Sequence, residues 1–334
     1  MHGDRKADLV LEGGGVKGVA LAGAVSRLAG EGYGFPRIAG TSAGAILGAV
    51  TAALQLAGES LTYVRDVALS LDYRRFADRG PLGSAAGPLQ PVVDLGSLLV
   101  DHGIYRGDAL HEFITSQLAQ LGVRTWADLR LSEDEGTSLE EDHRYALVIT
   151  VSDVARRKLV MLPWDYRDYG LDPDSQPVAD AVRMSASLPF FYEPVSLKSS
   201  YGESVMVDGG LLSNYPIKAF DRTDEKPPRW PTFGVKLSRR PPMVPRTREV
   251  GGLLSYLVAI ADTVHGANDA MNIEDPAVRA RTIFVDVGAV KATDFDLDEE
   301  TRISMLDAAD QATREFLEKW DFAEYVRRYR GVSA

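Results

Sequence analysis

Short apolar runs and helical segments alternate along this chain of 334 residues, and that alternation limits the fold more than any other feature. The apolar runs are rich in Val, Ile and Leu without clean polar alternation, which is typical of strands covered on both faces by helices. Strands are predicted at Asp8–Leu11, Arg37–Ala39, Tyr145–Val151, Leu159–Leu162, Val205–Val207, Phe233–Leu237 and Thr282–Val287. Helical periodicity fills the gaps at about 17–29, 44–57, 106–121, 176–186, 250–272 and 298–328. The pattern predicts an α/β fold with a mainly parallel sheet.

The chain is expected to form a single domain with excursions, because it shows no internal repeat and no convincing linker. Insertions are expected near 80–100, which is rich in Gly, Pro and Ala, and at 131–143, which is acidic. Prolines between Pro227 and Pro245 mark a third irregular zone. Each is typical of a solvated loop, although mobile lids are drawn from such segments.

Charge and composition exclude several classes of function. Lys and Arg total 37 against 48 for Asp and Glu, and the net charge of -11 argues against a broad surface for nucleic acid. With no cysteine, the chain has neither disulfides nor a thiolate metal site. The first residues lack the pattern of a signal peptide, so a cytoplasmic location is expected. Contact with a membrane would need an apolar patch or a local basic cluster such as Arg239–Arg240, which is more simply a solvated loop.

One stretch has the length of a membrane span. Ile38–Gly58 contains no charged residue and reaches the roughly 20 residues that a bilayer requires. It also contains several glycines and polar residues, with alanine in much of the rest. We therefore predict a strand, a turn and a fully buried helix here.

The first motif is Glu12-Gly13-Gly14-Gly15-Val16-Lys17-Gly18, which follows a predicted strand and opens a predicted helix. A dinucleotide-binding loop is one interpretation, with an acid near Glu31 for the ribose. A phosphate loop of the Walker kind is excluded, because Val19 and Ala20 stand where Lys and Ser or Thr would follow. An oxyanion hole is the third interpretation, since glycines let backbone N–H groups converge on an anion. The motif alone does not decide among these.

The second motif is Gly40-Thr41-Ser42-Ala43-Gly44, placed between a predicted strand and the predicted buried helix. This is the G-x-S-x-G pattern of a nucleophile elbow, where small residues prevent clashes around a strained turn. Because the bare pattern also arises by chance, its strand-turn-helix context carries the interpretation.

The third motif is Val207-Asp208-Gly209-Gly210, at the end of an apolar strand. An acid at the carboxyl end of a strand is where α/β active sites place a catalytic group. Asp-Gly is also a common turn dipeptide, and on this motif alone the turn is favoured.

Together, the three motifs in this order closely resemble the patatin-like phospholipase family. Its pattern is a glycine-rich oxyanion loop with a basic residue, a G-x-S-x-G elbow, and an Asp-Gly-Gly or Asp-Gly-Ala with the base. Further similarities are the segments Gly103–Leu110, Met184–Pro189 and Asn214–Pro216. The resemblance implies a three-layer α/β/α fold, with a patatin-like domain over 7–222 and its insertions near 80–100 and 131–143. Residues 223–334 would then be the C-terminal part of the same unit, helical at the end.

The resemblance also implies roles for particular residues. Ser42 would be the nucleophile and Asp208 the general base of a catalytic dyad. The oxyanion hole would take backbone N–H groups from Gly13, Gly14, Gly15 and Val16. Supporting roles fall to Lys17, Gly18, Gly40, Gly44, Gly209 and Gly210. The expected activity is hydrolysis of lipid or phospholipid acyl esters without a metal or cofactor; head group, positional preference and oligomeric state are not predicted.

Several alternatives remain open at this point. The same dyad would serve a soluble esterase, a thioesterase or an acyltransferase. A histidine triad would need His265, which lies after Asp208 but in an apolar helical run rather than in a loop after a strand. Two alternatives from other functional classes also remain open: a dinucleotide-binding oxidoreductase and a non-catalytic lipid-binding protein. Whether the apolar stretch Leu253–Ile273 faces the core or a membrane surface is also left open.

Overall fold

The computed structural model describes residues 5–76, 78, 104–132, 140–224, 226–238, 250–251, 256, 259–260, 263–264 and 272–331. The insertion predicted near 80–100 lies outside the described residues, as do residues 133–139 of the insertion predicted at 131–143. Most of the helix predicted at 250–272, Arg239–Arg240 and His265 also lie outside them.

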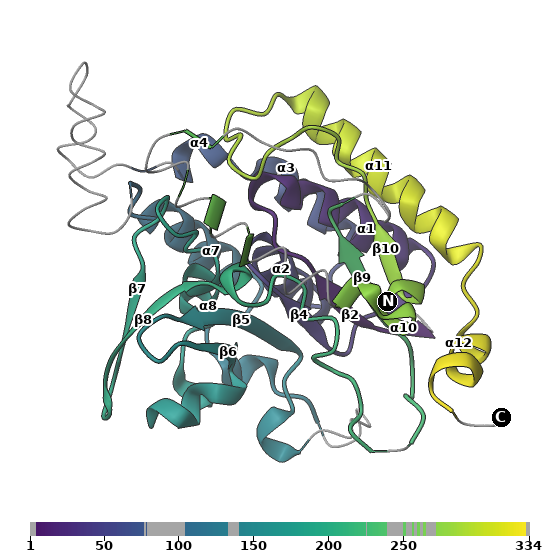
Figure 1. Ribbon diagram of the computed structural model, residues 1–334, viewed down its shortest axis with the longest axis horizontal. Helices are drawn as coiled ribbons and strands as arrows, with labels where there is room; N and C mark the ends of the chain where they lie inside the picture. Colours follow the sequence, from purple (N-terminus) through teal and green to yellow (C-terminus); the bar gives the residue numbers. More distant parts are fainter. Residues whose placement is uncertain are drawn as a thin grey trace.

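An eight-stranded sheet forms the centre of the molecule, in the order β10-β9-β2-β4-β5-β8-β7, with β6 pairing on β5 (Figure 1). The strands from β10 to β5 are parallel, whereas β6, β7 and β8 run antiparallel to their neighbours. Their bounds are β2 Asp8–Leu11, β4 Ile38–Gly40, β5 Leu147–Asp153, β6 Lys158–Leu162, β7 Val195–Ser199, β8 Gly202–Asp208, β9 Thr232–Lys236 and β10 Thr282–Phe284. A separate parallel pair is formed by β1 (Arg5–Lys6) and β3 (Tyr33–Gly34). The prediction of a mainly parallel sheet is confirmed.

The two faces of the sheet bury different apolar clusters. Along β2, Leu9 and Leu11 belong to a large core on one face, while Val10 belongs to a smaller core on the other. The larger core is covered by α1 Val19–Gly30, α2 Ala43–Leu56, α3 Val64–Ser70, α4 Tyr73–Phe76, α7 Asp108–Gln120, α8 Val178–Ser185 and α11 Glu299–Leu317. The smaller core is closed by α10 (Pro276–Ala280) and the segment 215–220, and α12 (Phe322–Tyr329) contacts α10. The fold is therefore a three-layer α/β/α arrangement, as predicted.

Short 3₁₀ helices complete the described structure. They are η1 Gly15–Gly18, η2 Leu61–Tyr63, η4 Trp126–Leu129, η6 Glu141–His143, η7 Trp164–Tyr169, η8 Pro173–Ser175 and η9 Gly209–Leu211. Within the described residues, no helix has the length and apolar character needed to cross a membrane. The uncharged stretch from Ile38 forms β4, a turn and the buried helix α2, as predicted.

Two predicted helices differ from the observed ones, and one edge strand was not predicted. The helix predicted at 298–328 is interrupted after Leu317, because the Asp321 side chain accepts a hydrogen bond from the Glu324 backbone and starts α12 as a new helix. The helix predicted from 106 begins at Asp108, after Gly107 with a φ of +77°. The edge strand β7 was not predicted, since its exposed positions carry Ser196 and Lys198 and leave little apolar signal.

The sheet register brings the three motifs to one edge. Leu11, the last residue of β2, pairs with Gly40, the last residue of β4. Gly40 in turn pairs with Ile149 of β5, and Asp208 pairs with Val151, two residues further along the same strand. The glycine-rich loop, the Ser42 turn and Asp208 therefore lie at neighbouring strand ends, where open α/β sheets place their sites.

Helix α11 packs closely against α1, and Figure 1 shows it running along the outer side of that helix. The contact depends on Gly23, because a Cβ atom there would lie 2.3 Å from the Leu306 carbonyl oxygen. Helix α11 follows the last strand of the sheet, so this contact helps hold the C-terminal segment on the core.

We expect Gly23→Ala to lower the free energy of unfolding by about 1–3 kcal/mol, because the added methyl group forces the two helices apart. The matched control is Gly30→Ala in the same helix, where a Cβ atom has no neighbour within 4 Å. The control should be neutral or stabilising by up to about 1 kcal/mol. Urea unfolding curves that place the two variants at equal stability would show that the α1–α11 contact is not this close.

Candidate active site

Ser42 occupies a strained turn between β4 and α2. Its φ of +52° and ψ of -120° are unusual for a residue other than glycine, and such conformations cost about 1–3 kcal/mol. The turn is possible because small residues surround it: a Cβ atom on Gly44 would lie 2.2 Å from the Leu11 carbonyl oxygen. This is the geometry that the G-x-S-x-G pattern predicts.

Hydrogen bonds from neighbouring elements fix the Ser42 backbone. Its N–H donates to Ser185 Oγ at 2.8 Å, and that hydroxyl donates to the Thr150 carbonyl oxygen at 2.7 Å. The preceding Thr41 hydroxyl lies 2.5 Å from the Thr150 hydroxyl. Helix α8 and strand β5 therefore both hold the turn in place.

Asp208, the last residue of β8, is buried, with 3% of its surface exposed. The Gly210 N–H donates a hydrogen bond to its Oδ1 at 2.7 Å. Burial raises the pKa of Asp208 from 3.8 to about 6, although the interactions of its carboxylate with the Ser42 side chain and the Gly210 N–H act in the opposite direction. The side chain shapes the turn at η9, which agrees with the turn interpretation of the Asp-Gly-Gly motif; its catalytic role stays a prediction.

The glycine-rich loop lies against Ser42, because a Cβ atom on Gly13 would be 3.1 Å from Ser42 Cβ. Two of its four N–H groups already have acceptors: Gly13 donates to the Asn214 carbonyl oxygen at 3.1 Å, and Val16 to that of Ala292 at 3.0 Å. The N–H groups of Gly14 and Gly15 have no acceptor among the described residues. Of the four N–H groups predicted for the oxyanion hole, those of Gly14 and Gly15 are therefore without an acceptor in the described part of the chain, and those of Gly13 and Val16 fix the loop.

A buried polar cluster holds this loop in shape. Glu12 forms an ion pair with Lys236 of β9 and accepts the Leu237 N–H. The Asn214 amide donates to the Gly13 carbonyl oxygen at 3.2 Å and to Glu12 at 3.3 Å. Because these contacts come from β9 and from the segment after Asp208, the loop is fixed on both sides.

Three of the glycines that were predicted in supporting roles are closely packed against neighbouring residues. A Cβ atom on Gly18 would lie 2.5 Å from Ala43 Cβ, and one on Gly209 would lie 2.2 Å from the Thr150 carbonyl oxygen. Gly40 is similarly close to Gly44. Lys17 in η1 is half-buried, and in the described part of the chain no acidic side chain pairs with it.

Glu31, the residue on which the dinucleotide alternative depends, is not brought to this site. Glu31 follows the last residue of α1, and that 12-residue helix separates it from the glycine loop by roughly 18 Å. An acid there is too far to bind a ribose whose pyrophosphate lies on the loop. Of the histidines that the structure describes, His111 pairs with Asp180 at 2.7 Å and His143 lies against Trp164. No cluster of potential metal ligands occurs among the described residues.

Two contributors to the site were missed by sequence reasoning. Ser185 lies in the segment Met184–Pro189, whose resemblance to the family was noted without a role for its serine. Ala292 fixes Val16 through its carbonyl oxygen, and a backbone acceptor leaves no signal in the residue type.

Comparisons with known proteins agree with this geometry. The family model for patatin-like phospholipases matches residues 9–221. The uncharacterized protein YqhO of Bacillus subtilis (strain 168) is 34% identical over 315 residues, which cover 94% of this chain and 99% of YqhO.

Two solved structures show a weaker similarity to this chain. VipD from Legionella pneumophila has a TM-score of 0.48 and 16% identity, covering 95% of this chain and 67% of VipD. ExoU from the type III secretion system of Pseudomonas aeruginosa, in complex with SpcU, has a TM-score of 0.48 and 18% identity. That match covers 94% of this chain and 52% of the ExoU chain, so the present chain spans about half the length of ExoU.

The family model covers residues 9–221, which is more than half of the chain. The chain belongs to the patatin-like phospholipase family.

Proposed function

We propose that the protein is a serine acyl hydrolase that cleaves acyl esters of lipids, with Ser42 as nucleophile and Asp208 as general base. The observation that carries the proposal is the interaction of Ser42, at its strained turn, with the buried carboxylate of Asp208. Membership of the family supports a lipid acyl hydrolase in the broad sense. The dyad and the substrate subtype are the finer parts of the proposal.

In the first half-reaction, Ser42 Oγ forms a bond to the ester carbonyl carbon while its proton passes to Asp208. The carbonyl oxygen becomes an oxyanion, which accepts hydrogen bonds from the N–H groups of Gly14 and Gly15 and lies near the positive end of α2. When the carbonyl re-forms, the bond to the alcohol oxygen breaks, and Asp208 returns its proton to that oxygen.

In the second half-reaction, water attacks the acyl group on Ser42 while Asp208 takes a proton from it. Collapse of this second oxyanion releases the fatty acid, and the proton returns to Ser42 Oγ. No histidine is required, because one carboxylate accepts and returns each proton.

Burial of Asp208 makes this chemistry feasible near neutral pH. An ordinary aspartate is a weak base, whereas a pKa of about 6 lies closer to the pH at which the enzyme would work. The carboxylate still ionises in that range, and its interaction with the Ser42 side chain supports proton transfer between the two groups.

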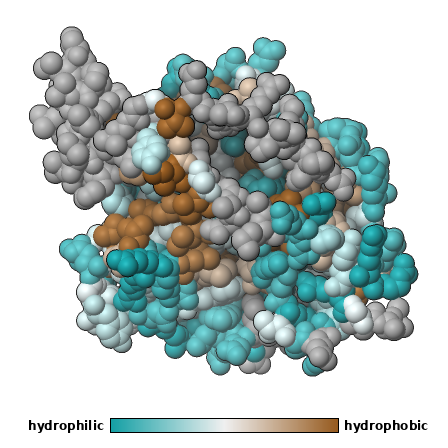
Figure 2. All heavy atoms as spheres, in the orientation of Figure 1, coloured by the Kyte–Doolittle hydropathy of each residue, from teal (hydrophilic) through white to brown (hydrophobic). Residues whose placement is uncertain are grey.

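Apolar surface near the site supports a lipid substrate. Leu188, Pro189, Phe190 and Phe191 are all half-buried, and they follow Ser187, whose carbonyl oxygen accepts the Asp208 N–H at 2.9 Å. Figure 2 shows apolar side chains gathered over the part of this face where α7 and α8 lie, while the side of α11 is largely hydrophilic. An acyl chain would find apolar contacts beside the dyad.

Peripheral contact with a membrane belongs to the same proposal. In the stretch Leu253–Ile273, the described side chains of Tyr256, Ile260 and Val264 are exposed, which favours contact with lipid or a partner over a core position for these three. A cytoplasmic location remains an expectation from sequence.

A soluble esterase, thioesterase or acyltransferase would use the same dyad, and products separate them. The purified protein should be incubated with phospholipids, lysophospholipids and triacylglycerols, and the released acids identified by mass spectrometry. Release of fatty acid from lipid esters supports the proposal; transfer to an added alcohol without release would identify an acyltransferase. Turnover of short dispersed esters alone would identify a soluble esterase.

We expect Ser42→Ala to abolish labelling by a fluorophosphonate and release of fatty acid, since it removes only the attacking oxygen. Ser116→Ala, a change of the same kind in the exposed surface of α7, should label like the wild type. Gel fluorescence measures the labelling, and far-UV circular dichroism checks the fold. Undiminished labelling of the Ser42→Ala protein would assign the nucleophile elsewhere.

The raised pKa of Asp208 predicts the pH profile. The base works only when ionised, so kcat/KM for a neutral ester should rise about tenfold per pH unit below about pH 6 and level off above it. Initial rates over a range of pH, on protein shown to remain folded, measure this. A profile that is level down to about pH 4 would mean that a buried Asp208 is not the base.

A further inference from the structure

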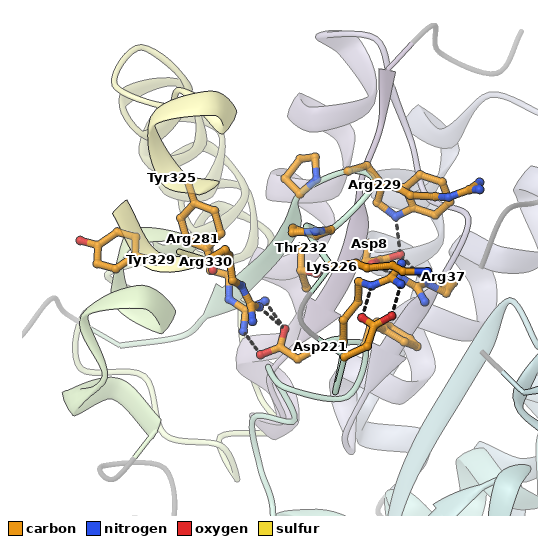
Figure 3. A pocket seen from close by; sticks show the side chains of 16 residues that line it. Asp8, Arg37, Asp221, Lys226, Arg229, Thr232, Arg281, Tyr325, Tyr329 and Arg330 are labelled. Atoms are coloured by element: carbon orange, nitrogen blue, oxygen red, sulfur yellow. Dashed lines mark hydrogen bonds and ion pairs between the residues drawn. The ribbon is translucent and has the colours of Figure 1, made fainter. Parts of the chain in front are cut away.

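Figure 3 shows a cavity of about 220 Å³. It lies at the amino ends of the parallel strands, whereas Ser42 follows the carboxyl end of β4. Asp8 and Thr232, the first residues of β2 and β9, line it, together with Arg37 and Arg281, which immediately precede β4 and β10. The cavity therefore opens at the amino ends of β2 and β4, whose carboxyl ends lead into the glycine-rich loop and Ser42. Its occupant would not reach Ser42.

The described side chains around this cavity are unusually cationic for an acidic protein. Six are basic and three acidic, which leaves three positive charges unmatched, although the whole chain has a net charge of -11. The basic residues are Arg37, Arg222, Lys226, Arg229, Arg281 and Arg330, and the acidic ones are Asp8, Asp221 and Asp224. A local positive potential inside a hollow attracts anions.

The acids hold the arginines in fixed positions. Asp221 accepts hydrogen bonds from both Nη atoms of Arg281, at 2.6 and 2.7 Å, and pairs with Arg330 at 3.0 Å, as Figure 3 shows. Asp8 binds Arg37 Nε at 2.7 Å and is also bound by Trp230. Each guanidinium has five N–H donors, so these contacts leave several unused.

Buried donors without acceptors gather at the same place. In the described part of the chain, six buried side-chain nitrogen or oxygen atoms have no hydrogen-bond partner. Three of them belong to residues that line this cavity: Arg281 Nε, Arg330 Nε and the Tyr325 hydroxyl. Buried polar groups are normally satisfied, and such a concentration is typical of a site that receives a polar ligand.

We propose that this cavity binds a small phosphorylated ligand, a phosphate ester with a compact polar group. Arginine forks match phosphate oxygens, and the surplus of positive charge suits a dianionic phosphate better than a single carboxylate. The volume is below the roughly 300–1,000 Å³ of sites for drug-sized ligands, which limits the organic part to the size of a glycerol or sugar. Trp230 and Tyr329 supply aromatic surface for that part.

The phosphate ester has two sources, a free metabolite or the head group of a lipid. The test measures binding to the full-length protein by isothermal titration calorimetry, with inorganic phosphate and glycerol 3-phosphate as free probes. Flotation with phosphatidylcholine vesicles, with and without phosphatidic acid, probes the lipid source. Neither readout depends on acyl hydrolysis, so the proposal stands or fails separately from the proposed function.

Two variants remove positive charge from the cavity. Lys226→Gln with Arg229→Gln changes two exposed side chains that have no ion-pair partner among the described residues, so folding should be unaffected. Arg330→Gln removes an inner donor but leaves the Asp221–Arg281 pair intact. Lys198→Gln with Arg124→Gln is the matched control, with the same charge change on other exposed positions.

Saturable binding of glycerol 3-phosphate, weakened at least about tenfold in both cavity variants and unchanged in the control, is the expected result. Binding to phosphatidic acid vesicles alone, with the same dependence on the cavity variants, would assign the lipid source. Absence of saturable binding to any probe would overturn the proposal, as would equal weakening in the control.

Discussion

The strained turn at Ser42 is the constraint on which the rest of the structure depends. A serine at φ +52° is tolerated only where its surroundings hold it, and here strand β4, helix α2 and the hydrogen bond to Ser185 do so. The parallel sheet supplies those surroundings, because it brings Leu11 close enough to Gly44 that no larger residue fits. The larger apolar core then offsets the cost of the turn by packing α1, α2 and α11 on the same face.

Burial of Asp208 is a second feature of the site that lowers the stability of the fold, because it raises the pKa of the carboxyl group. Because its folded-state pKa is raised above 3.8, this group favours the folded state fully only below that pH, and the benefit is lost as pH rises through about 6. A shift of this size corresponds to roughly 3 kcal/mol of stability lost at neutral pH. The fold thus gives up stability at neutral pH to hold a carboxyl group of raised pKa beside Ser42, a conflict common at active sites.

Much of the fold followed from local patterns in the sequence. The apolar runs at Asp8–Leu11 and Tyr145–Val151 predicted buried parallel strands because their residues are covered on both faces. The Ser42 turn was predictable because the pattern of small residues that it requires occupies five consecutive positions of the sequence. Which N–H groups of the glycine-rich loop have acceptors was not predictable from the sequence. The acceptors for Gly13 and Val16 are the carbonyl oxygens of Asn214 and Ala292, which lie far along the chain.

The cationic cavity was equally hidden from sequence. Its basic residues come from widely separated segments, around Arg37, Arg222–Arg229, Arg281 and Arg330, and each segment alone looks like ordinary solvated surface. Only the parallel sheet, which gathers the amino ends of four strands at one edge, brings them together.

The central claim is that a buried Asp208 is the base for Ser42, and the most direct measurement is kcat/KM of Asp208→Asn alongside its thermal stability. The amide keeps an oxygen for the Gly210 N–H but accepts no proton, so activity should fall by about 10²–10⁴-fold. Above pH 6 the melting temperature should stay level or rise, because a buried charge is removed. Asp72→Asn, at an exposed turn where Asp72 accepts the Arg74 N–H, should retain full activity. Retention of more than about a third of wild-type activity by a folded Asp208→Asn protein would contradict the account.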